Sequence, residues 1–304
     1  MKCLFFVGGI VLMSFSSFAT QNLEIEHRTM VYEDTLALDI FYPKQKDNEL
    51  KPLLIYVHGG GFSGGNRDRG IDYCEYFAGK GWVTATISYH LTMKDQSFSC
   101  GQAVQNKINT LLTAAQNVNQ ATAFLLEKSE QFNIDPSTVV IAGSSAGAEA
   151  VLQAAYWKKS QENILADGFK YAGVVSMAGA ILDQNWITPD AAIPTALFHG
   201  TCDPLVPFAT AAHHYCSPDD TGFMMFFGSH TIAEKLHSVN RGYYFVSSCG
   251  GGHEWAGRPM NEEYRYMTAD FLEKDVLQKQ ARQIHIPLKY QVKDCQPEFD
   301  FCGQ

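Results

Sequence analysis

Positive charge is scarce in this sequence. Lysine and arginine together number 23 against 32 aspartate and glutamate residues, which gives a formal net charge of −9. No basic cluster interrupts this balance, and proteins that bind phosphate backbones or anionic membrane surfaces depend on such clusters. The composition therefore argues against a nucleic-acid or membrane partner. It favours a globular protein that acts on a small or neutral molecule.

The sequence also lacks an apolar run of about 20 residues, the length that a helix needs to span a bilayer. A shorter apolar run, Cys3–Met13, follows Lys2 and precedes the small residues of Ser17-Phe18-Ala19. This layout is typical of a secretory signal peptide. We therefore predict cleavage after Ala19 and a secreted or periplasmic location.

Seven of the eight cysteines lie outside the predicted signal, and seven is an odd number. Because export places them in an oxidising compartment, we expect disulfides together with at least one unpaired thiol or intermolecular bond. Cys295 and Cys302 are close neighbours near the C-terminal end, which favours a local loop, although the sequence does not determine the pairing. No CxxC pair is present, so we expect no structural zinc site and no metal.

No internal repeat, low-complexity tract or flexible linker divides the 304 residues. The alternating segment Thr35–Tyr42 predicts an antiparallel edge strand, and apolar positions over residues 104–125 follow the period of a helix. Short runs that are apolar on both faces, typical of strands buried in a parallel sheet, alternate with helical patterns. These runs are Pro52–Val57, Trp82–Tyr89, Val139–Ala142, Ala172–Met177, Thr195–Phe198 and Tyr243–Val246. The alternation predicts an α/β fold, a mostly parallel, doubly wound sheet with helices on both faces.

A sharp turn is predicted where Gly143-Ser144-Ser145-Ala146-Gly147 joins a buried strand to a helix. A nucleophile on such a turn has strained backbone angles, and flanking glycines let neighbouring elements approach closely. The turn would raise the Ser145 hydroxyl above the sheet and direct the Ala146 N–H at the charge that develops during attack. We predict that Ser145 is a nucleophile, and an ordinary tight turn is the alternative.

A glycine loop, His58-Gly59-Gly60-Gly61-Phe62, follows the first buried run. Three residues without side chains suggest close approach to a ligand, and we predict that the N–H groups of Gly60 and Gly61 join Ala146 in an oxyanion hole. The alternatives are a flexible loop and a phosphate-binding loop. Neither GxGxxG nor GxxxxGK[ST] is present, so we expect no nucleotide cofactor. Phe62 and Trp255, which neighbour the glycine motifs, are predicted to contact substrate.

Two further candidate catalytic residues follow buried runs later in the chain. His253, after three glycines, would act as general base and then general acid, and Asp203 would orient its imidazole and stabilise the imidazolium. Taken singly, an aspartate before proline favours a turn and a lone histidine favours a structural role. The order of Ser145, Asp203 and His253, each after a buried run, favours a catalytic triad. Asp183 and Asp190 are weaker candidates for the acid.

These motifs resemble those of the α/β-hydrolase superfamily, in its esterase and carboxylesterase group. The resemblance covers roughly residues 22–275 and rests on His58–Phe62, Gly143–Gly147 and the segments around Asp203 and His253. It implies a secreted serine hydrolase that cleaves carboxylic esters through an acyl-enzyme, without a cofactor. The substrates of this group include small acyl esters, acetyl or feruloyl esters of plant cell walls, and lipids.

Several segments depart from the family pattern. Ser88-Tyr89-His90-Leu91 has histidine where the family has arginine, and the interval 180–195 is too short for a full cap domain. The segments Lys158–Gly168 and Pro207–His230 would form only partial walls. We therefore predict an open site, suited to a short-acyl ester or to an ester attached to a polysaccharide.

The predicted domain organisation is a signal peptide over residues 1–19, a hydrolase domain over 20–279 and a C-terminal tail over 280–304 without an assigned function. Two alternatives to an esterase remain open at this point. One is an amidase or peptidase of the same fold, and the other is a catalytically silent binding protein.

Overall fold

The computed structural model describes residues 23–44, 49–289, 295 and 299–303. The predicted signal peptide lies outside these residues. No helix in the described ranges is long and apolar enough to cross a membrane.

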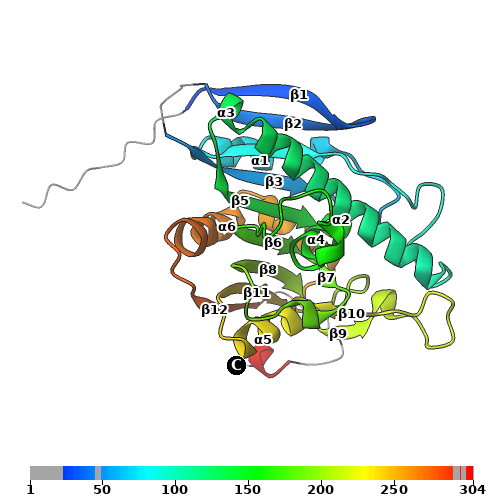
Figure 1. Ribbon diagram of the computed structural model, residues 1–304. Helices are drawn as coiled ribbons and strands as arrows, with labels where there is room; N and C mark the ends of the chain where they lie inside the picture. Colours follow the sequence, from blue (N-terminus) through cyan, green and yellow to red (C-terminus); the bar gives the residue numbers. More distant parts are fainter. Residues whose placement is uncertain (1–22, 45–48, 290–294, 296–298, 304) are drawn as a thin grey trace, which may run out of the picture.

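Among the described residues, nine strands form one sheet in the order β1-β2-β4-β3-β5-β6-β8-β11-β12 (Figure 1). From β4 to β12 all neighbours are parallel, whereas β1 pairs with β2, and β2 with β4, in antiparallel fashion. The strands are β1 (Ile25–Glu33), β2 (Leu36–Pro43), β3 (Lys51–Val57), β4 (Val83–Ile87), β5 (Ile134–Ser144), β6 (Gly173–Met177), β8 (Thr195–Gly200), β11 (Tyr243–Cys249) and β12 (Gln283–Lys289). The predicted mostly parallel α/β sheet is confirmed. The segment predicted as an edge strand forms β2, one position inside the edge.

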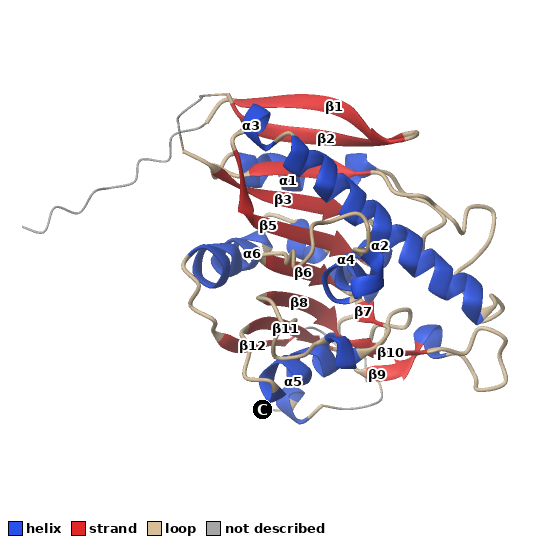
Figure 2. Ribbon diagram, in the orientation of Figure 1, coloured by secondary structure: helices blue, strands red, loops and turns tan. Residues whose placement is uncertain are grey.

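Helices cover both faces of this sheet (Figure 2). Apolar side chains of α2, α4 and α5 form one hydrophobic core against the sheet, and those of α1 and α6 form a second core on the opposite face. The helices are α1 (Ile71–Ala78), α2 (Val104–Glu127), α3 (Ser129–Phe132), α4 (Ala146–Tyr156), α5 (Ser229–Ser238) and α6 (Arg265–Phe271). Because both faces are covered, the central strands are apolar on both sides, which is the pattern that the sequence shows.

A small antiparallel sheet lies beside the carboxyl ends of the parallel strands (Figure 1). It consists of β7 (Ala180–Ile181), β10 (Met225–Gly228) and β9 (Thr210–Ala212). Two of these strands come from the segment Pro207–His230, which the sequence analysis predicted as a partial wall.

The C-terminal segment continues the main sheet. Strand β12 pairs in parallel with β11, from Gln283 opposite Tyr243 to Lys289 opposite Cys249. Its side chains alternate between exposed and half-buried, which is typical of an edge strand covered on one face. Pro287 is compatible with this position because one side of an edge strand makes no ladder hydrogen bonds. The predicted domain boundary at residue 279 is therefore wrong.

Three disulfides connect distant parts of the chain: Cys100–Cys216, Cys202–Cys295 and Cys249–Cys302. Cys74 is buried and free, in agreement with the expected unpaired thiol. The expected local bond between Cys295 and Cys302 is wrong, because Cys295 is bonded to Cys202 in the loop after β8 and Cys302 is bonded to Cys249, the last residue of β11. Cys3 lies outside the described residues.

Candidate active site

Ser145 lies at the turn between β5 and α4, near the middle of the sheet. Its backbone angles, φ 52° and ψ −122°, are in a region that residues other than glycine rarely adopt. A Cβ added to Gly143 would lie 2.2 Å from the Gly147 oxygen, and one added to Gly147 would lie 2.1 Å from the Val57 oxygen. Both glycines are therefore required by close backbone contacts. These contacts hold the turn between α4 and the end of β3.

Three side chains from separate loops form a continuous hydrogen-bonded row. Ser145 Oγ lies 2.8 Å from His253 Nε2, and His253 Nδ1 lies 2.7 Å from Asp203 Oδ2. The loops follow β5, β8 and β11, whose carboxyl ends lie at the same edge of the sheet. With the proton on Nδ1, the imidazole donates to the carboxylate and its Nε2 accepts from the serine hydroxyl. The structure thus brings together the three residues predicted as a triad.

Asp203 is 1% exposed, and its two carboxylate oxygens contact hydrogen-bond donors. Its Oδ1 accepts from the backbone N–H groups of Leu205 and Val206, at 2.8 and 3.0 Å. His199 Nε2 lies 3.2 Å from Oδ2, on the same oxygen that His253 contacts. Burial by itself would raise the pKa of Asp203, but the hydrogen bonds from His199 and His253 outweigh it and hold the pKa well below its usual range. The carboxylate is therefore ionised at neutral pH.

His253 begins a short 3₁₀ helix, His253–Ala256, after the glycines that follow β11. Its side chain is 23% exposed, in contrast to the fully buried carboxylate that it contacts. Burial would lower the pKa of His253, but the hydrogen bond and the negative charge of Asp203 reverse this effect and raise the pKa above the ordinary value. A more basic imidazole is better able to accept a proton from a hydroxyl.

The glycine loop after β3 packs against the serine turn. A Cβ on Gly59 would lie 2.8 Å from the Ser144 oxygen, and Gly60, at φ 131°, accepts hydrogen bonds from the N–H groups of Ser63 and Gly64 at 3.1 Å. Gly60, Gly61 and Ala146 all line the cavity beside Ser145. Their role as an oxyanion hole stays a prediction.

The cavity beside Ser145 has a volume of 410 Å³ and both apolar and polar walls. Its lining includes the apolar Phe62, Phe98, Leu205 and Val206 and the polar Arg69, Glu149, His213 and His214. Phe62 forms part of the wall, at the position where the sequence analysis placed a substrate contact. Trp255 does not line this cavity: it is fully buried and its ring packs 5.1 Å from that of Tyr264. The prediction that Trp255 contacts substrate is wrong, because the 3₁₀ helix turns its ring into the core.

A buried polar pair in the cavity wall was not predicted from the sequence. Glu149 and His213 are 1% and 2% exposed, and Glu149 Oε1 lies 2.9 Å from His213 Nε2. His214 stacks on His213 at 4.4 Å, and burial together with the nearby His213 lowers the pKa of His214 to about 4. Glu149, one turn after Ser145 in a mostly apolar helix, is the sequence signal that could have indicated this pair.

Other sequence candidates lie away from the row. Asp183 caps a 3₁₀ helix through the Asn185 N–H, and Asp190 lines a separate cavity together with the predicted partial wall Lys158–Gly168. His90, which stands where the family has arginine, instead contacts the Asn117 side chain on α2 at 3.0 Å.

One cluster of possible metal ligands occurs within the described ranges: Cys100, Cys216 and Asp220. Its two sulfur atoms are bonded to each other, so they are not free to bind a cation.

Comparisons with known proteins agree with this architecture. Residues 38–185, which include the glycine loop and Ser145 but not Asp203 or His253, match the BD-FAE family model. Gut esterase 1 of Caenorhabditis elegans is 35% identical over 124 residues, which cover 40% of this chain and 21% of that protein. Fumonisin B1 esterase of Sphingopyxis macrogoltabida is 31% identical over 124 residues, covering 39% and 22%. The matched segment thus spans about a fifth of the length of these curated relatives.

Solved structures of an esterase resemble the whole fold. The apo form of Thermogutta terrifontis esterase 2 matches with a TM-score of 0.56 and 17% identity, covering 86% of this chain and 97% of that chain. The propionate-bound form of the same enzyme matches with a TM-score of 0.55 and 19% identity, covering 84% and 95%. Together with the sheet order and the sharp turn at Ser145, these matches show that the chain has the α/β-hydrolase fold.

Proposed function

We propose that this protein hydrolyses carboxylic esters through an acyl-enzyme intermediate on Ser145. The observation that carries the proposal is the hydrogen-bonded row, with 2.8 Å between Ser145 and His253 and 2.7 Å between His253 and Asp203. A serine hydroxyl is a weak nucleophile until a neighbouring base accepts its proton. In this row the base is in contact with the hydroxyl and is itself oriented by a third group, which is the arrangement that nucleophilic catalysis requires.

In the first half of the reaction, Ser145 Oγ attacks the ester carbonyl while His253 Nε2 accepts its proton. The imidazolium that forms remains in contact with the ionised Asp203, which stabilises it without taking the proton. His253 then donates that proton to the departing alcohol. In the second half, His253 Nε2 accepts a proton from a water molecule as its oxygen attacks the acyl carbonyl. The imidazolium then donates that proton to the departing Ser145 Oγ, which releases the acid and restores the serine hydroxyl and the neutral imidazole.

The negative charge on the tetrahedral oxygen requires donors that are already in place. We assign this role to the N–H groups of Gly60, Gly61 and Ala146. Ala146 is the first residue of α4, where the N–H groups have no partner within the helix and the helix dipole favours negative charge. The glycines allow the substrate to approach the backbone without steric hindrance from a side chain.

For the substrate, we propose short-acyl esters or acetyl and feruloyl esters attached to polysaccharide. A cavity of 410 Å³ accommodates a small or aromatic acyl group, and its wall combines phenyl rings with the buried polar pair Glu149–His213. The esterase of Thermogutta terrifontis has been solved with propionate and with butyrate bound, which supports short acyl groups for a protein of this fold. A lipid substrate is disfavoured if activity does not rise with acyl length from acetyl to palmitoyl esters.

We further propose that the protein functions outside the cytoplasm. Three disulfides support this location, because such bonds persist in oxidising compartments. N-terminal sequencing of the protein recovered from the periplasm or the medium tests it, and cleavage after Ala19 is the expected result.

The replacement Ser145→Ala tests the assignment of the nucleophile. We expect kcat for 4-nitrophenyl acetate to fall by a factor of roughly 10⁴–10⁶, because only substrate binding and oxyanion stabilisation remain. A fluorophosphonate probe should label the wild type and leave this variant unlabelled. Ser137→Ala, at an exposed serine on β5, is the matched control and should keep both activity and labelling.

Two results would overturn the proposal. Unchanged turnover by Ser145→Ala would exclude Ser145 as the nucleophile, and absence of labelling in the folded wild type would favour a silent binding protein. Matched ester and amide substrates with the same acyl group separate an esterase from an amidase, since a preference for the amide would reassign the activity.

A further inference from the structure

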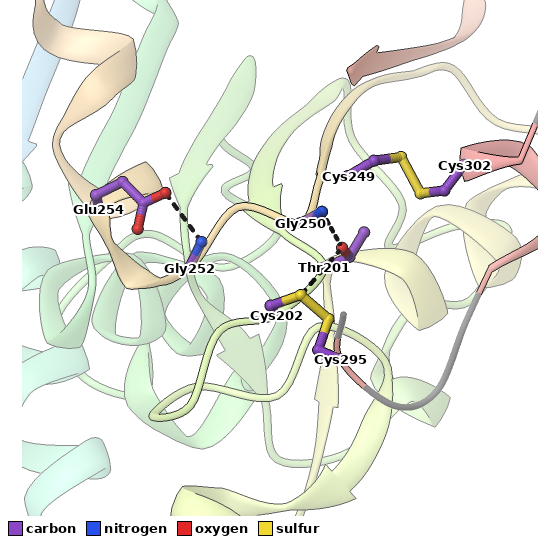
Figure 3. Close-up of a disulfide and its surroundings, with 8 residues drawn as sticks. All are labelled: Thr201, Cys202, Cys249, Gly250, Gly252, Glu254, Cys295 and Cys302. Atoms are coloured by element: carbon purple, nitrogen blue, oxygen red, sulfur yellow. Dashed lines mark hydrogen bonds between the residues drawn. A yellow bond between two sulfur atoms is a disulfide. The ribbon is translucent and has the colours of Figure 1, made fainter. Parts of the chain in front are cut away.

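The loops that carry Asp203 and His253 are tightly joined to each other. The N–H of Thr201 donates to the Ser248 oxygen at 2.9 Å, and the N–H of Cys202 donates to the Gly251 oxygen at 2.8 Å. A third hydrogen bond, also 2.9 Å, runs from the Gly250 N–H to the Thr201 hydroxyl (Figure 3). The two loops therefore behave as one unit at the carboxyl ends of β8 and β11.

The glycines before His253 provide close packing rather than free movement. A Cβ on Gly251 would lie 2.5 Å from Ser248 Oγ and 2.7 Å from Trp255 Nε1. A Cβ on Gly200, in the neighbouring strand end, would lie 2.3 Å from the Gly251 oxygen. Glycine has the largest conformational freedom in an unconstrained chain, so this unit depends on its contacts to keep a single geometry.

The C-terminal segment is covalently attached to both loops. Cys295 is bonded to Cys202, the residue directly before Asp203, and Cys302 is bonded to Cys249, four residues before His253 (Figure 3). Strand β12 brings the same segment alongside β11, so that Lys289 lies opposite Cys249. The chain that follows β12 is thus joined at one point to the acid loop and at another to the histidine loop.

Aromatic packing adds a third attachment. The Phe299 ring lies 4.8 Å from that of Phe208, five residues after Asp203, and the Phe301 ring lies 4.6 Å from that of His285 on β12. Phe208 is 2% exposed, so these rings close the core beneath the acid loop. This packing and the two disulfides thus attach the C-terminal segment to the same region.

We propose that the C-terminal segment, through Cys295, Cys302 and the rings of Phe299 and Phe301, positions Asp203 and His253 for catalysis. This inference rests on the proposed function of the site. The cysteines are positioning residues, since they contact neither substrate nor the reacting atoms. Their effect is to keep the His253 imidazole aligned with both Ser145 and Asp203, and a misplacement of about 1 Å in such a row costs about 100-fold in rate.

The test removes each crosslink by a double substitution, Cys202→Ala with Cys295→Ala, and Cys249→Ala with Cys302→Ala. The matched control is Cys100→Ala with Cys216→Ala, which removes the disulfide with the longest sequence separation, 116 residues against 93 and 53. Because the entropic effect of a crosslink grows with loop length, the control should lose at least as much thermal stability. We expect kcat to fall by roughly 10- to 100-fold in the first two variants and to stay near the wild-type value in the control, all measured well below the midpoint of unfolding.

The pH profile separates positioning from general loss of stability. Asp203 raises the pKa of His253, and the acidic limb of kcat/KM reports the pKa of the catalytic base in the free enzyme. If the two side chains separate, this pKa falls, and the acidic limb moves to lower pH while the plateau rate decreases. The other titratable groups near this pair, which are Glu149, Glu254, His214 and the His199 that contacts Asp203, are unchanged in the variants. The downfield proton signal of His253 Nδ1–H in NMR should weaken in parallel.

A second measurement applies if a double variant does not fold. Folded wild type is treated with TCEP, free thiols are alkylated, and mass spectrometry determines which disulfide has opened at each level of remaining activity. We expect activity to fall with the opening of Cys202–Cys295 or Cys249–Cys302 and not with the opening of Cys100–Cys216.

Unchanged kcat and an unmoved acidic limb in both crosslink variants would overturn this inference, as would activity that follows only Cys100–Cys216. Such results leave the proposed function intact if Ser145→Ala remains inactive. Turnover by Ser145→Ala, in contrast, would contradict the proposed function itself.

Discussion

The two halves of the candidate catalytic row are held in place by different means. Ser145 stands at the end of a central strand, where its turn is held by backbone contacts of Gly143 and Gly147 with neighbouring elements. Asp203 and His253 lie on loops after β8 and β11, close to the edge of the sheet, where two disulfides tie them to the C-terminal segment. The central strand β5 has several neighbouring strands on either side, whereas β8 and β11 lie near the edge of the sheet, where the disulfides add contacts to the C-terminal segment.

The difference extends to the cysteines. Cys74 on α1 packs in a hydrophobic core with side chains of β3 and β5 and remains a free thiol, although the other described cysteines form three disulfides. On the acid and histidine side, both cysteines near the row are crosslinked. Two of the three disulfides among the described residues thus lie on the acid and histidine side.

The largest effect after loss of Ser145 is expected for Asp203→Asn. The amide keeps the shape but favours the wrong imidazole tautomer, and we expect kcat to fall by about 10³–10⁴. His253 also loses the charge that raises its pKa, so the acidic limb of kcat/KM should move to lower pH. Steady-state rates across the pH range check both effects, and a limb that moves to higher pH would contradict the assigned role of Asp203.

A smaller effect, and one on stability, is expected on the serine side for Gly147→Ala. The added Cβ would lie 2.1 Å from the Val57 oxygen, so β3 and α4 must separate. We expect the free energy of unfolding to fall by about 1–3 kcal/mol, measured by urea denaturation. Gly101→Ala is the control, because no atom lies within 4 Å of a Cβ at that position. Equal stability of the two variants would show that packing does not determine the serine turn.

The smallest effect is expected for Cys74→Ala. Burial raises the pKa of the Cys74 thiol far above its ordinary value, so the native protein should resist alkylation by iodoacetamide. The substitution should lower the free energy of unfolding by about 1 kcal/mol and leave kcat unchanged, since it removes one buried atom from a core away from the row. If Cys74→Ala lost as much activity as the crosslink variants, the proposed difference between the serine side and the acid and histidine side would be contradicted.

Much of the fold and of the candidate row could be predicted because its signals are local. The buried runs, the helix over 104–127 and the glycine turn at Ser145 are recognisable from neighbouring residues alone. The edge strand Gln283–Lys289 also alternates in sequence, yet it was predicted as part of a tail because it lies beyond the family pattern. The error at Trp255 had a different cause, since adjacency to His253 does not show to which side of a turn a ring points.

The sequence by itself determined the kind of sheet, the strand-to-helix turn and the order in which serine, acid and histidine follow buried strands. These depend on periodicity and on the conformational range of glycine, which act over a few residues. Only the tertiary structure decided which cysteines pair, that Glu149 meets His213 in the cavity wall, and that the C-terminal segment reaches both loops of the row. Such contacts depend on which strands become neighbours, and residues separated by 50 to 116 positions carry no local signal of their meeting.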